Sequence, residues 1–171
     1  MDMNSLTRIL VVSDTHGLIR HELTPFIANA DFILHVGDFG SKENLHFFRQ
    51  TDKLAACVRG NVDRGGWART LPATDLTQIA GLTFYLIHNL NELDIEPSTA
   101  KVDFVLYGHT HQPDHKVKNG IHFLNPGSFG PPRFNLPISL ATIEVKKADD
   151  QPMAISSMVR FFRHDGGSLT V

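Results

Sequence analysis

Five short apolar runs in this chain each end in residues of a type that binds metal ions. The runs are rich in β-branched and aromatic residues, which is typical of buried β-strands. In order along the chain, the side chains that follow them are Asp14 and His16, Asp38, Asn61, His88, and His109 and His111. Ligand sites in parallel-type sheets form at the carboxyl ends of the strands. The pattern is hard to explain unless the five strands end at a shared polar centre.

The length and composition indicate one domain over residues 1–171, since 171 residues suffice for a core without disulfide bonds. Cys57 is the single cysteine, so no intrachain disulfide can form and a reducing compartment is expected. Its apolar surroundings favour a buried hydrophobe over a nucleophile. Residues 1–8 contain no apolar segment, and no membrane span is visible, so we expect a cytoplasmic protein.

The charge distribution argues against nucleic-acid binding. The formal net charge is −2, and the lysines and arginines are scattered along the chain. A basic stripe for duplex nucleic acid is therefore absent, which disfavours a nuclease. Histidine is abundant, with ten residues, and four of them stand at the strand ends described above.

The first half of the chain predicts alternating strands and helices. Strands are expected at about 8–13 and 32–36, and a third ends at Val58. Apolar positions favour a helix within 18–30, and Pro25 indicates that it begins near Thr24, because proline is tolerated in the first helical turn. A second helix is expected from Ser41, a favourable N-cap residue. This alternation predicts a parallel sheet with right-handed crossovers.

The second half predicts closely spaced strands. They are expected at about 75–79, 82–88, 102–107, 115–117, 121–124, 138–145 and 154–161. Asn119-Gly120 between two of them is a strong hairpin signal. These strands indicate a second, mostly antiparallel sheet. Residues 89–100 are polar and contain a proline, which predicts a loop or a short helix, and 165–171 are expected to form a loose tail.

The types of residue at the strand ends suit a pair of divalent ions. On extended chain, Asp14 and His16 would point to the same side, and His109 and His111 repeat this spacing. Carboxylate and imidazole together suit Mn²⁺, Fe²⁺ or Zn²⁺ better than Mg²⁺ or Ca²⁺. Seven ligands divide naturally between two ions, with Asp38 able to bridge. With two carboxylates and a hydroxide, two such ions keep a formal charge of about +1, which attracts a phosphate.

The ordered motifs resemble those of the calcineurin-like metallophosphoesterase superfamily. Within it, the chain is most similar to the small bacterial and archaeal phosphodiesterase branch, which is related to the retromer scaffold subunit of eukaryotes. The motifs that carry the resemblance are Asp14-Thr15-His16, Gly37-Asp38, Gly60-Asn61-Val62-Asp63, His88, Gly108-His109-Thr110-His111 and Asn125-Pro126-Gly127-Ser128. The resemblance implies an α/β fold, a four-layer α/β/β/α sandwich of two mixed sheets flanked by helices.

The resemblance also implies a division of the ligands. One ion would be held by Asp14, His16, Asp38 and His111, and the other by Asp38 as the bridge with Asn61, His88 and His109. Mn²⁺ is the first choice, with Zn²⁺, Fe²⁺ or Ni²⁺ as alternatives. The implied activity is hydrolysis of a small phosphodiester by a metal-bridging hydroxide, with Asp38, Asn61 and His109 as the catalytic residues. The alternative is a non-catalytic scaffold protein that retains the fold. The oligomeric state stays open.

Three positions depart from patterns of the wider superfamily. Many members carry histidine directly after the Gly-Asn pair, where it is assigned to leaving-group protonation, whereas this chain has Val62. General acid catalysis contributes about 10²–10⁴-fold, so esters with poor leaving groups should suffer most. The phosphodiesterase branch commonly lacks that histidine. Asn89 replaces a usual glycine, and Phe39-Gly40-Ser41 replaces the Asp-Arg-Gly of protein phosphatases, which argues against a phosphoprotein phosphatase.

Several other polar residues allow two interpretations. Asp63 could order a histidine beside the metal ions or hold the turn around Asn61. The Asn125–Ser128 segment is a turn that could contact phosphate, while Arg64 and Arg133 are favoured as solvated rather than substrate-binding side chains. The remaining histidines are expected in or beside strands (His35, His115, His122) or on the surface (His21, His46, His164).

Overall fold

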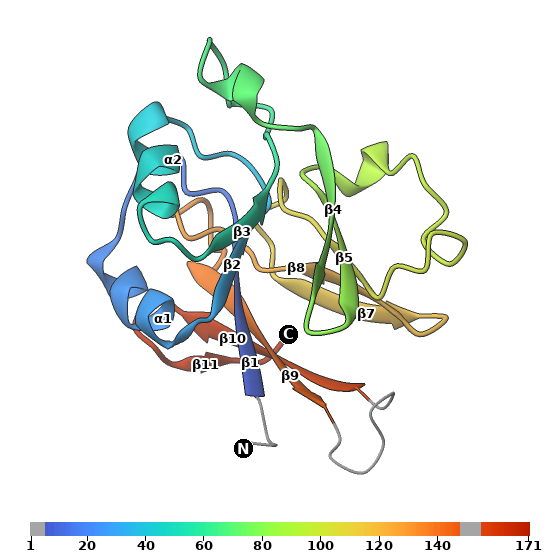
Figure 1. The fold of residues 1–171 in the computed structure, drawn as a ribbon. Helices are drawn as coiled ribbons and strands as arrows, with labels where there is room; N and C mark the ends of the chain where they lie inside the picture. Colours follow the sequence, from blue (N-terminus) through green and yellow to red (C-terminus); the bar gives the residue numbers. More distant parts are fainter. Residues whose placement is uncertain (1–5, 148–154) are drawn as a thin grey trace.

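Two β-sheets lie face to face at the centre of the molecule (Figure 1). The computed structural model describes residues 6–147 and 155–171. The first sheet has the strand order β11-β10-β9-β1-β2-β3. Its strands are β1 (Leu6–Val12), β2 (Phe32–His35), β3 (Leu54–Cys57), β9 (Ser139–Lys147), β10 (Ile155–Arg163) and β11 (Ser168–Leu169). The three strands β1, β2 and β3 are parallel to one another, β9 pairs antiparallel with β1, and β10 pairs antiparallel with β9.

The second sheet has the strand order β4-β5-β6-β8-β7. Its strands are β4 (Thr74–Ile79), β5 (Leu82–Ile87), β6 (Phe104–Leu106), β7 (Asp114–Lys118) and β8 (Ile121–Asn125). The central strands β5, β6 and β8 run parallel, while β4 and β7 pair antiparallel at the two edges. Both sheets are therefore mixed, as the resemblance implied.

The main core fills the space between the sheets. It contains fully buried residues of both, among them Ile9 and Leu34 from the first and Phe84 and Phe104 from the second. A second core lies under the helices on the outer face of the first sheet. On the outer face of the second sheet, Leu90, Leu93 and Ile95, around the 3-10 turn η3 (Leu90–Glu92), pack over buried strand residues. This loop with its short turn is the outer layer there, in agreement with the prediction for 89–100.

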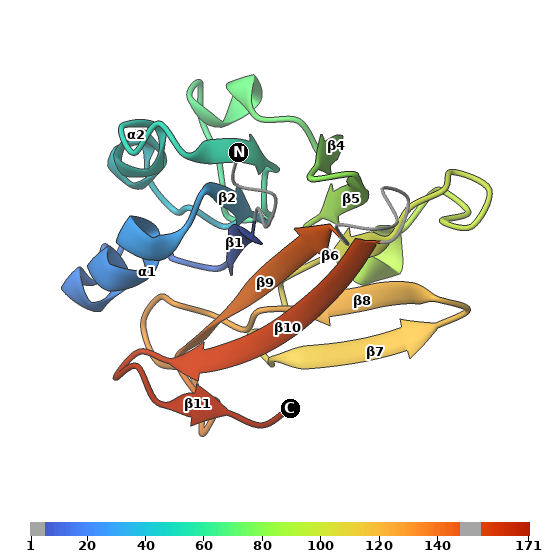
Figure 2. The ribbon, with the colours of Figure 1, turned by 60° about the horizontal axis from the view of Figure 1, so that its bottom comes forward.

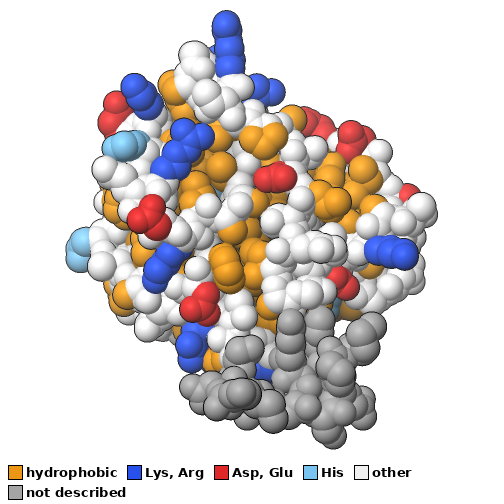
Figure 3. All heavy atoms as spheres, in the orientation of Figure 1, with side chains coloured by type: hydrophobic (Ala, Val, Ile, Leu, Met, Phe, Trp, Pro, Cys, Tyr) orange, Lys and Arg blue, Asp and Glu red, His pale blue; other side chains and the backbone are white. Residues whose placement is uncertain are grey.

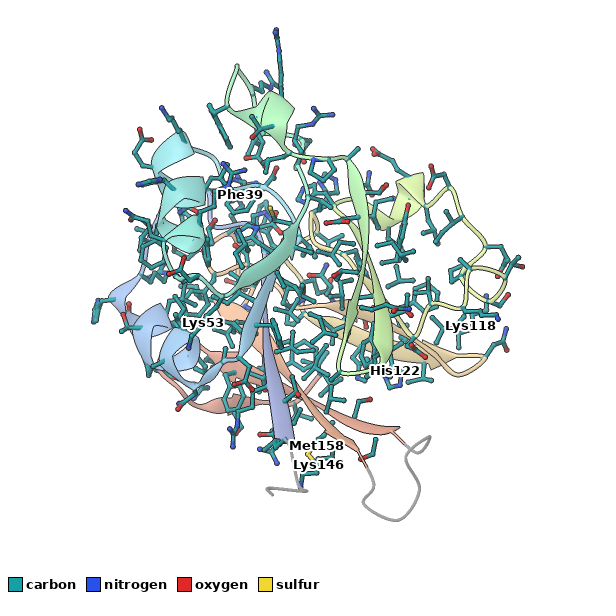
Figure 4. The ribbon with its side chains drawn as sticks, in the orientation of Figure 1. Phe39, Lys53, Lys118, His122, Lys146 and Met158 are labelled. Atoms are coloured by element: carbon teal, nitrogen blue, oxygen red, sulfur yellow. The ribbon has the colours of Figure 1, made fainter. Side chains whose placement is uncertain are left out.

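Two helices cover the first sheet over its parallel strands (Figure 2). α1 (Thr24–Asn29) follows the 3-10 turn η1 (His21–Leu23), and it begins at Thr24 as predicted from Pro25. The Lys53 ammonium donates hydrogen bonds to the carbonyls of Ile27, Ala28 and Ala30, and Figure 4 shows Lys53 beside this helix end. A cation at a helix C-terminus satisfies free carbonyls and complements the helix dipole.

The second helix, α2 (Lys42–Arg49), begins after Ser41, whose side chain accepts a hydrogen bond from the Asn44 amide. The predicted N-cap is therefore confirmed. A further 3-10 turn, η2 (Ala68–Thr70), lies in the loop before β4. Cys57 is half-buried against the core under the helices, and burial raises the pKa of its thiol to about 11. A thiol held protonated in this way behaves as a small hydrophobe, as predicted.

The sequence placed two late strands in the wrong sheet. The expected strands at 138–145 and 154–161 form β9 and β10, which extend the first sheet beside β1 and leave the second sheet mixed rather than mostly antiparallel. Ala154, the first residue expected in the later strand, lies outside the described residues. The tail prediction for 165–171 was wrong as well, because β11 pairs with β10 through Phe161–Leu169 and Phe162–Ser168.

The surface carries charges of both signs without a dominant one on the face seen in Figure 3, where acidic and basic side chains are interspersed around hydrophobic ones. Among the described residues, no helix is long and apolar enough to cross a membrane. Of residues 1–8, for which the sequence predicts no apolar segment, residues 1–5 lie outside the described residues.

Candidate metal centre

The carboxyl ends of the parallel strands in both sheets meet at one place. After β1 and β2, the Asp14 amide donates to the Gly37 carbonyl at 3.0 Å. After β5 and β6, the Gly108 amide donates to the His88 carbonyl, also at 3.0 Å. The His109 amide then crosses between the sheets and donates to Asp14 Oδ2 at 3.1 Å. The loops that carry the predicted ligands are thus tied together by backbone hydrogen bonds.

Five of the seven predicted ligands adopt a left-handed backbone conformation. Their φ values are +54° at Asp14, +47° at His16, +57° at Asp38, +69° at His109 and +59° at His111. We expected Asp14 and His16 to converge because extended chain would direct both to one side, and this reason was wrong. The loops after β1, β2 and β6 instead contain residues at which the backbone turns sharply. This conformation is uncommon for residues other than glycine, and such residues cluster at functional sites.

The first group of ligands comes from opposite sheets. Asp14, His16 and His111 bring their ligand atoms close enough together to hold a metal ion. The Nε2 atoms of His16 and His111 lie 3.1 Å apart. Asp14 Oδ1 lies 3.1 Å from Nε2 of His111 and 3.7 Å from Nε2 of His16.

The second group contains Asp38, His88, Asn61 and His109. Asp38 Oδ2 lies 3.3 Å from His88 Nε2. Asn61 Oδ1 lies 3.2 Å from His88 Nε2 and 3.0 Å from His109 Nδ1. The neutral amide oxygen and the two imidazoles therefore surround one point, with the carboxylate beside them.

The two groups are continuous through Asp38. Its Oδ2 atom lies 3.8 Å from His16 Nε2 in the first group and 3.3 Å from His88 Nε2 in the second. The other oxygen, Oδ1, accepts a hydrogen bond from the Val62 amide at 2.9 Å. This placement suits a carboxylate that touches both ions. The structure thus brings together all seven side chains that the sequence singled out.

His88 is held in the form that can bind a metal ion. Its Nδ1 atom lies 2.7 Å from the carbonyl oxygen of Val36. A carbonyl only accepts hydrogen bonds, so Nδ1 carries the proton and donates it. In the neutral ring the lone pair is then on Nε2, which faces Asn61 and Asp38. Such a backbone contact fixes both the tautomer and the ring orientation of a metal-binding histidine.

The buried carboxylates concentrate negative charge at the centre. Burial would raise the pKa of Asp14, but His111, His16 and the charge of His88 hold that pKa well below its ordinary value. For Asp38, burial again would raise the pKa, but the contact with His88 brings this pKa below its ordinary value. Burial would lower the pKa of His88, yet Asp38 and Asp14 raise it. Both acids are therefore ionised at neutral pH and favour positive charge nearby.

A buried oxygen without a hydrogen-bond partner lies where a metal ion would bind. Asp14 Oδ1 and His111 Nδ1 are buried without a hydrogen-bond partner among the described residues. Asp14 Oδ1 instead faces Nε2 atoms of His111, His16 and His88 at 3.1, 3.7 and 4.0 Å. Leaving a buried carboxylate oxygen without a partner is costly. A cation shared by this oxygen and the imidazole nitrogens would satisfy it, so the residues fit divalent ions.

Two glycines leave room for the carboxylates. A methyl group on Gly60 would collide with the carboxylate and the backbone nitrogen of Asp38. A methyl group on Gly108 would collide with Ser13 and with Asp14 Oδ2. Glycine is required at both positions because the backbone of one loop passes directly over the ligand of another.

Asp63 holds the turn around Asn61, one of the two roles considered for it. Its Oδ2 atom accepts a hydrogen bond from the Gly60 amide at 2.8 Å. Its Oδ1 atom accepts from the Gly40 amide, also at 2.8 Å. The side chain thereby joins the loop after β3 to the loop after β2, and it contacts no histidine in these hydrogen bonds.

A buried polar chain beneath the ligands was not anticipated from the sequence. The Gly37 amide donates to Nδ1 of His35 at 3.2 Å, so the proton of this ring is on Nε2. Nε2 lies 3.1 Å from Thr15 Oγ1, which in turn donates to Asn44 Oδ1 at 2.8 Å. Burial lowers the pKa of His35 to about 3. This neutral histidine joins the two loops that carry Asp14, His16 and Asp38.

The His35 ring is also fixed by stacking. It lies against Phe39 with ring centroids 3.7 Å apart and an interplanar angle of 14°. Figure 4 shows Phe39 at the end of the molecule where α2 lies. The sequence signal that could have identified His35 is a polar residue inside an apolar strand, two residues before the Gly37-Asp38 pair.

The segment around Asn125 supports the site from the other sheet. Ser128 Oγ donates to the carbonyl of Asp14 at 2.9 Å, and Asn125 Nδ2 donates to the carbonyl of Gly108 at 2.9 Å. The segment thus fixes the backbone on either side of the centre. Of the two arginines considered, Arg64 is exposed, and Arg133 lines a small recess with His111 and Ser128.

A cavity of about 400 Å³ opens beside the second group of ligands. Asn61, His88 and His109 line one side of it. The other lining residues are Arg59, Gly60, Ala73, Thr74, Ile87, Asn89, Glu92 and Asp94. Molecules that reach the centre from this side would pass along polar side chains.

The sequence matches a family model and is similar to a protein of described family. A family model described as the calcineurin-like phosphoesterase superfamily domain matches residues 7–148. A protein of Methanothermobacter thermautotrophicus described as a probable metallophosphoesterase is 32% identical over 157 residues, which are 81% of this chain and 87% of that protein.

Two solved structures share the fold. A Streptococcus pneumoniae protein described as a predicted phosphoesterase has a TM-score of 0.70 at 23% identity, with 96% of this chain and 94% of that chain covered. Vacuolar protein sorting 29 from Cryptosporidium parvum also has a TM-score of 0.70, at 18% identity, with 92% and 98% covered. At these identities the similarity concerns the fold alone.

Proposed function

The chain belongs to the calcineurin-like phosphoesterase superfamily, and we propose that it is a metal-dependent phosphodiesterase with a dinuclear centre. The observation that carries the proposal is the unsatisfied Asp14 Oδ1 atom, which faces three imidazole nitrogens within 4.0 Å. The substrate would be a small phosphodiester, and Mn²⁺ the preferred ion.

In this proposal the seven side chains divide between two ions. Asp14, His16 and His111 would hold the first ion, Asn61, His88 and His109 the second, and Asp38 would touch both. Divalent ions in such a site supply a Lewis acid for phosphoryl oxygens and lower the pKa of a bound water to near neutrality. The hydrogen bond from His88 to Val36 keeps the His88 ring oriented, and the Val62 amide does the same for the Asp38 carboxylate.

The residues at the cavity mouth suggest how a substrate would be placed. Asn61 and His109 are exposed and line the cavity, so we assign them, with Asp38, the contacts closest to the reacting phosphate. The Val62 side chain follows directly and cannot donate a proton to a leaving group. The reaction therefore favours esters whose leaving group needs no protonation.

The site has room for the additional arm of a diester. A diester has a second arm, and the cavity of about 400 Å³ beside Asn61, His88 and His109 offers space for it. The arm would extend along the cavity while its phosphate lies at the ligands.

The proposal is tested with two chromogenic esters. Purified protein loaded with Mn²⁺, Ni²⁺ or Zn²⁺ is assayed with bis-p-nitrophenyl phosphate and with p-nitrophenyl phosphate. We expect turnover of the diester with a higher kcat/KM than for the monoester. Asp38→Asn and His109→Ala should remove this activity while the circular dichroism spectrum stays native. Asp165→Asn, an exposed acid on the far C-terminal hairpin, is the matched control.

The proposal fails if the diester is not hydrolysed with any of these ions by protein shown to bind two of them. It also fails if Asp38→Asn retains the wild-type rate.

A second candidate is a scaffold protein that retains the fold, and the similarity to vacuolar protein sorting 29 favours it. The complete set of seven ligand-type side chains favours the enzyme instead. A stable partner that co-purifies with metal-free protein, together with no hydrolysis, would reverse this ranking.

A further inference from the structure

The cavity beside the candidate centre has a lining that restricts what it can bind. Asn61, His88 and His109 form the side nearest the ions, and neither His16 nor His111 lines it. The cavity therefore extends from one flank of the centre only. If a phosphodiester lies at the centre, as the proposed function requires, one of its two arms enters this space.

The remaining lining of the cavity offers both hydrogen-bond donors and acceptors. Arg59 is an exposed donor, and no ion pair of its side chain occurs among the described residues. Glu92 Oε1 accepts a hydrogen bond from Asn89 Nδ2 at 3.2 Å, and Asp94 Oδ1 accepts one from the Tyr85 hydroxyl at 2.9 Å. In the described part of the chain, the second oxygen of each carboxylate accepts no further hydrogen bond, which leaves it available to a ligand.

The charge of the lining disfavours ionic arms. Glu92 and Asp94 carry two negative charges and Arg59 one positive charge, so the formal sum is −1 in this part of the cavity. An anionic arm would be repelled by the carboxylates. A cationic arm would meet the Arg59 guanidinium and the two proposed ions.

Apolar arms are disfavoured as well. The aliphatic side chains that line the cavity are those of Ala73 and Ile87, and the aromatic rings in the lining are the imidazoles of His88 and His109. A nucleobase would need a stacking platform, and a quaternary ammonium would need an aromatic cage. Neither is found in the lining of this cavity.

We propose that this cavity is a subsite for a neutral arm with several hydroxyl groups, such as a sugar or a polyol. A hydroxyl both donates and accepts, which matches carboxylate acceptors and a guanidinium donor side by side. Arg59, Asn89, Glu92 and Asp94 are the residues that recognise it. The proposal rests on the proposed function and identifies the class of its substrate.

The test uses two diesters with the same leaving group. One joins p-nitrophenyl phosphate to the 6-hydroxyl of glucose, and the other joins it to cyclohexylmethanol, which matches the ring size without hydroxyl groups. In both, water adds to phosphorus and the bond to p-nitrophenolate breaks. The products are the phosphomonoester of the arm, p-nitrophenolate and a proton. We expect a kcat/KM for the sugar diester about tenfold above that of the cyclohexylmethyl diester with Mn²⁺-loaded protein.

The preference should depend on the carboxylates of the subsite. In Glu92→Gln/Asp94→Asn the ratio of the two kcat/KM values should fall below about threefold, since hydrogen bonds to charged groups are the stronger ones. Glu96→Gln lies in the same loop, outside the cavity lining, and is the matched control that should keep the ratio. Thermal unfolding confirms that each variant is folded.

The outcomes separate the two proposals. Hydrolysis of both diesters with equal kcat/KM, or a ratio unchanged in the double variant, overturns the subsite and leaves the phosphodiesterase standing. No hydrolysis of either diester by protein that holds two Mn²⁺ ions overturns both.

Discussion

The Nε2 atoms of His16 and His111 lie 3.1 Å apart, although His16 follows β1 of the first sheet and His111 follows β6 of the second sheet. Both rings also approach Asp14 Oδ1, which has no hydrogen-bond partner among the described residues. This convergence of imidazole nitrogens on a carboxylate oxygen without a hydrogen-bond partner is expected around a bound cation.

Removal of one histidine should remove one of two ions. His111→Ala takes away a ligand of the first group and leaves Asn61, His88 and His109 intact. We expect isothermal titration with Mn²⁺ to show two bound ions per chain for the wild type and one for the variant. His21→Ala, whose side chain is 93% exposed and belongs to neither group of candidate ligands, should still bind two. Equal stoichiometry for His111→Ala and the wild type would exclude His111 as a ligand.

The close approach at Gly60 gives a second prediction. In Gly60→Ala the new methyl group would meet the Asp38 carboxylate and displace it. We expect weaker Mn²⁺ binding, loss of hydrolysis and a loss of about 1–3 kcal/mol in the free energy of unfolding. Gly66→Ala is the matched control, because a methyl group there meets no atom within 4 Å. A variant at Gly60 with native metal affinity would show that the Asp38 carboxylate need not occupy its present position.

His35 should make stability depend on pH. Burial lowers its pKa from 6.5 to about 3 in the folded protein. Between these two values the unfolded chain binds a proton that the folded protein does not, so the free energy of unfolding falls as the pH falls below about 6.5. The loss approaches about 1.4 kcal/mol per pH unit. Between pH 6 and pH 4, metal-free wild type should therefore lose about 2 kcal/mol more than His35→Gln.

Urea unfolding in the presence of EDTA measures this difference. His35→Gln keeps a donor towards Thr15, so the fold should survive while the titrating ring is gone. At pH 7 the variant should be less stable, and the two curves should approach one another as the pH falls. Parallel curves from pH 7 to pH 4 would mean that His35 has the same pKa in the folded and the unfolded protein.

Val62 allows a test of how the leaving group is stabilised. Because valine cannot donate a proton, the rate should fall steeply as the pKa of the leaving alcohol rises. Val62→His introduces a proton donor beside Asn61 and should raise kcat for alkyl esters by about 10²-fold while changing that for p-nitrophenyl esters little. Kinetics on a series of aryl and alkyl diesters give the slope of log kcat against the pKa of the leaving alcohol. An unchanged slope in Val62→His would indicate that another group already protonates the leaving oxygen.

The residues that meet at the candidate centre were predictable because each of them follows a recognisable apolar strand. Hydrophobic runs identify strands from local sequence, and chemistry-bearing residues directly after them point to the sheet edge where sites form. The geometry of the ligands was not predictable in the same way. The left-handed conformations of Asp14, His16 and Asp38 depend on hydrogen bonds between loops that are distant in sequence, such as that from the Asp14 amide to Gly37.

The strands with which β9, β10 and β11 pair could not be predicted from local sequence either. An alternating pattern indicates that β9 and β10 are strands, but it is equally compatible with either sheet. β9 pairs with β1 across more than a hundred residues, and β11 has only two residues, Ser168 and Leu169. The role of His35 was hidden for a related reason, because its partner Thr15 lies in a different loop.

The most direct test of the central claim is an anomalous diffraction measurement on crystals grown with Mn²⁺. We expect two peaks per chain, one in contact with Asp14, His16 and His111 and the other with Asn61, His88 and His109, with the Asp38 carboxylate in contact with both. A dinuclear centre is excluded if no peak occurs among these side chains in crystals that contain the ion, or if the side chains lie apart around ordered water.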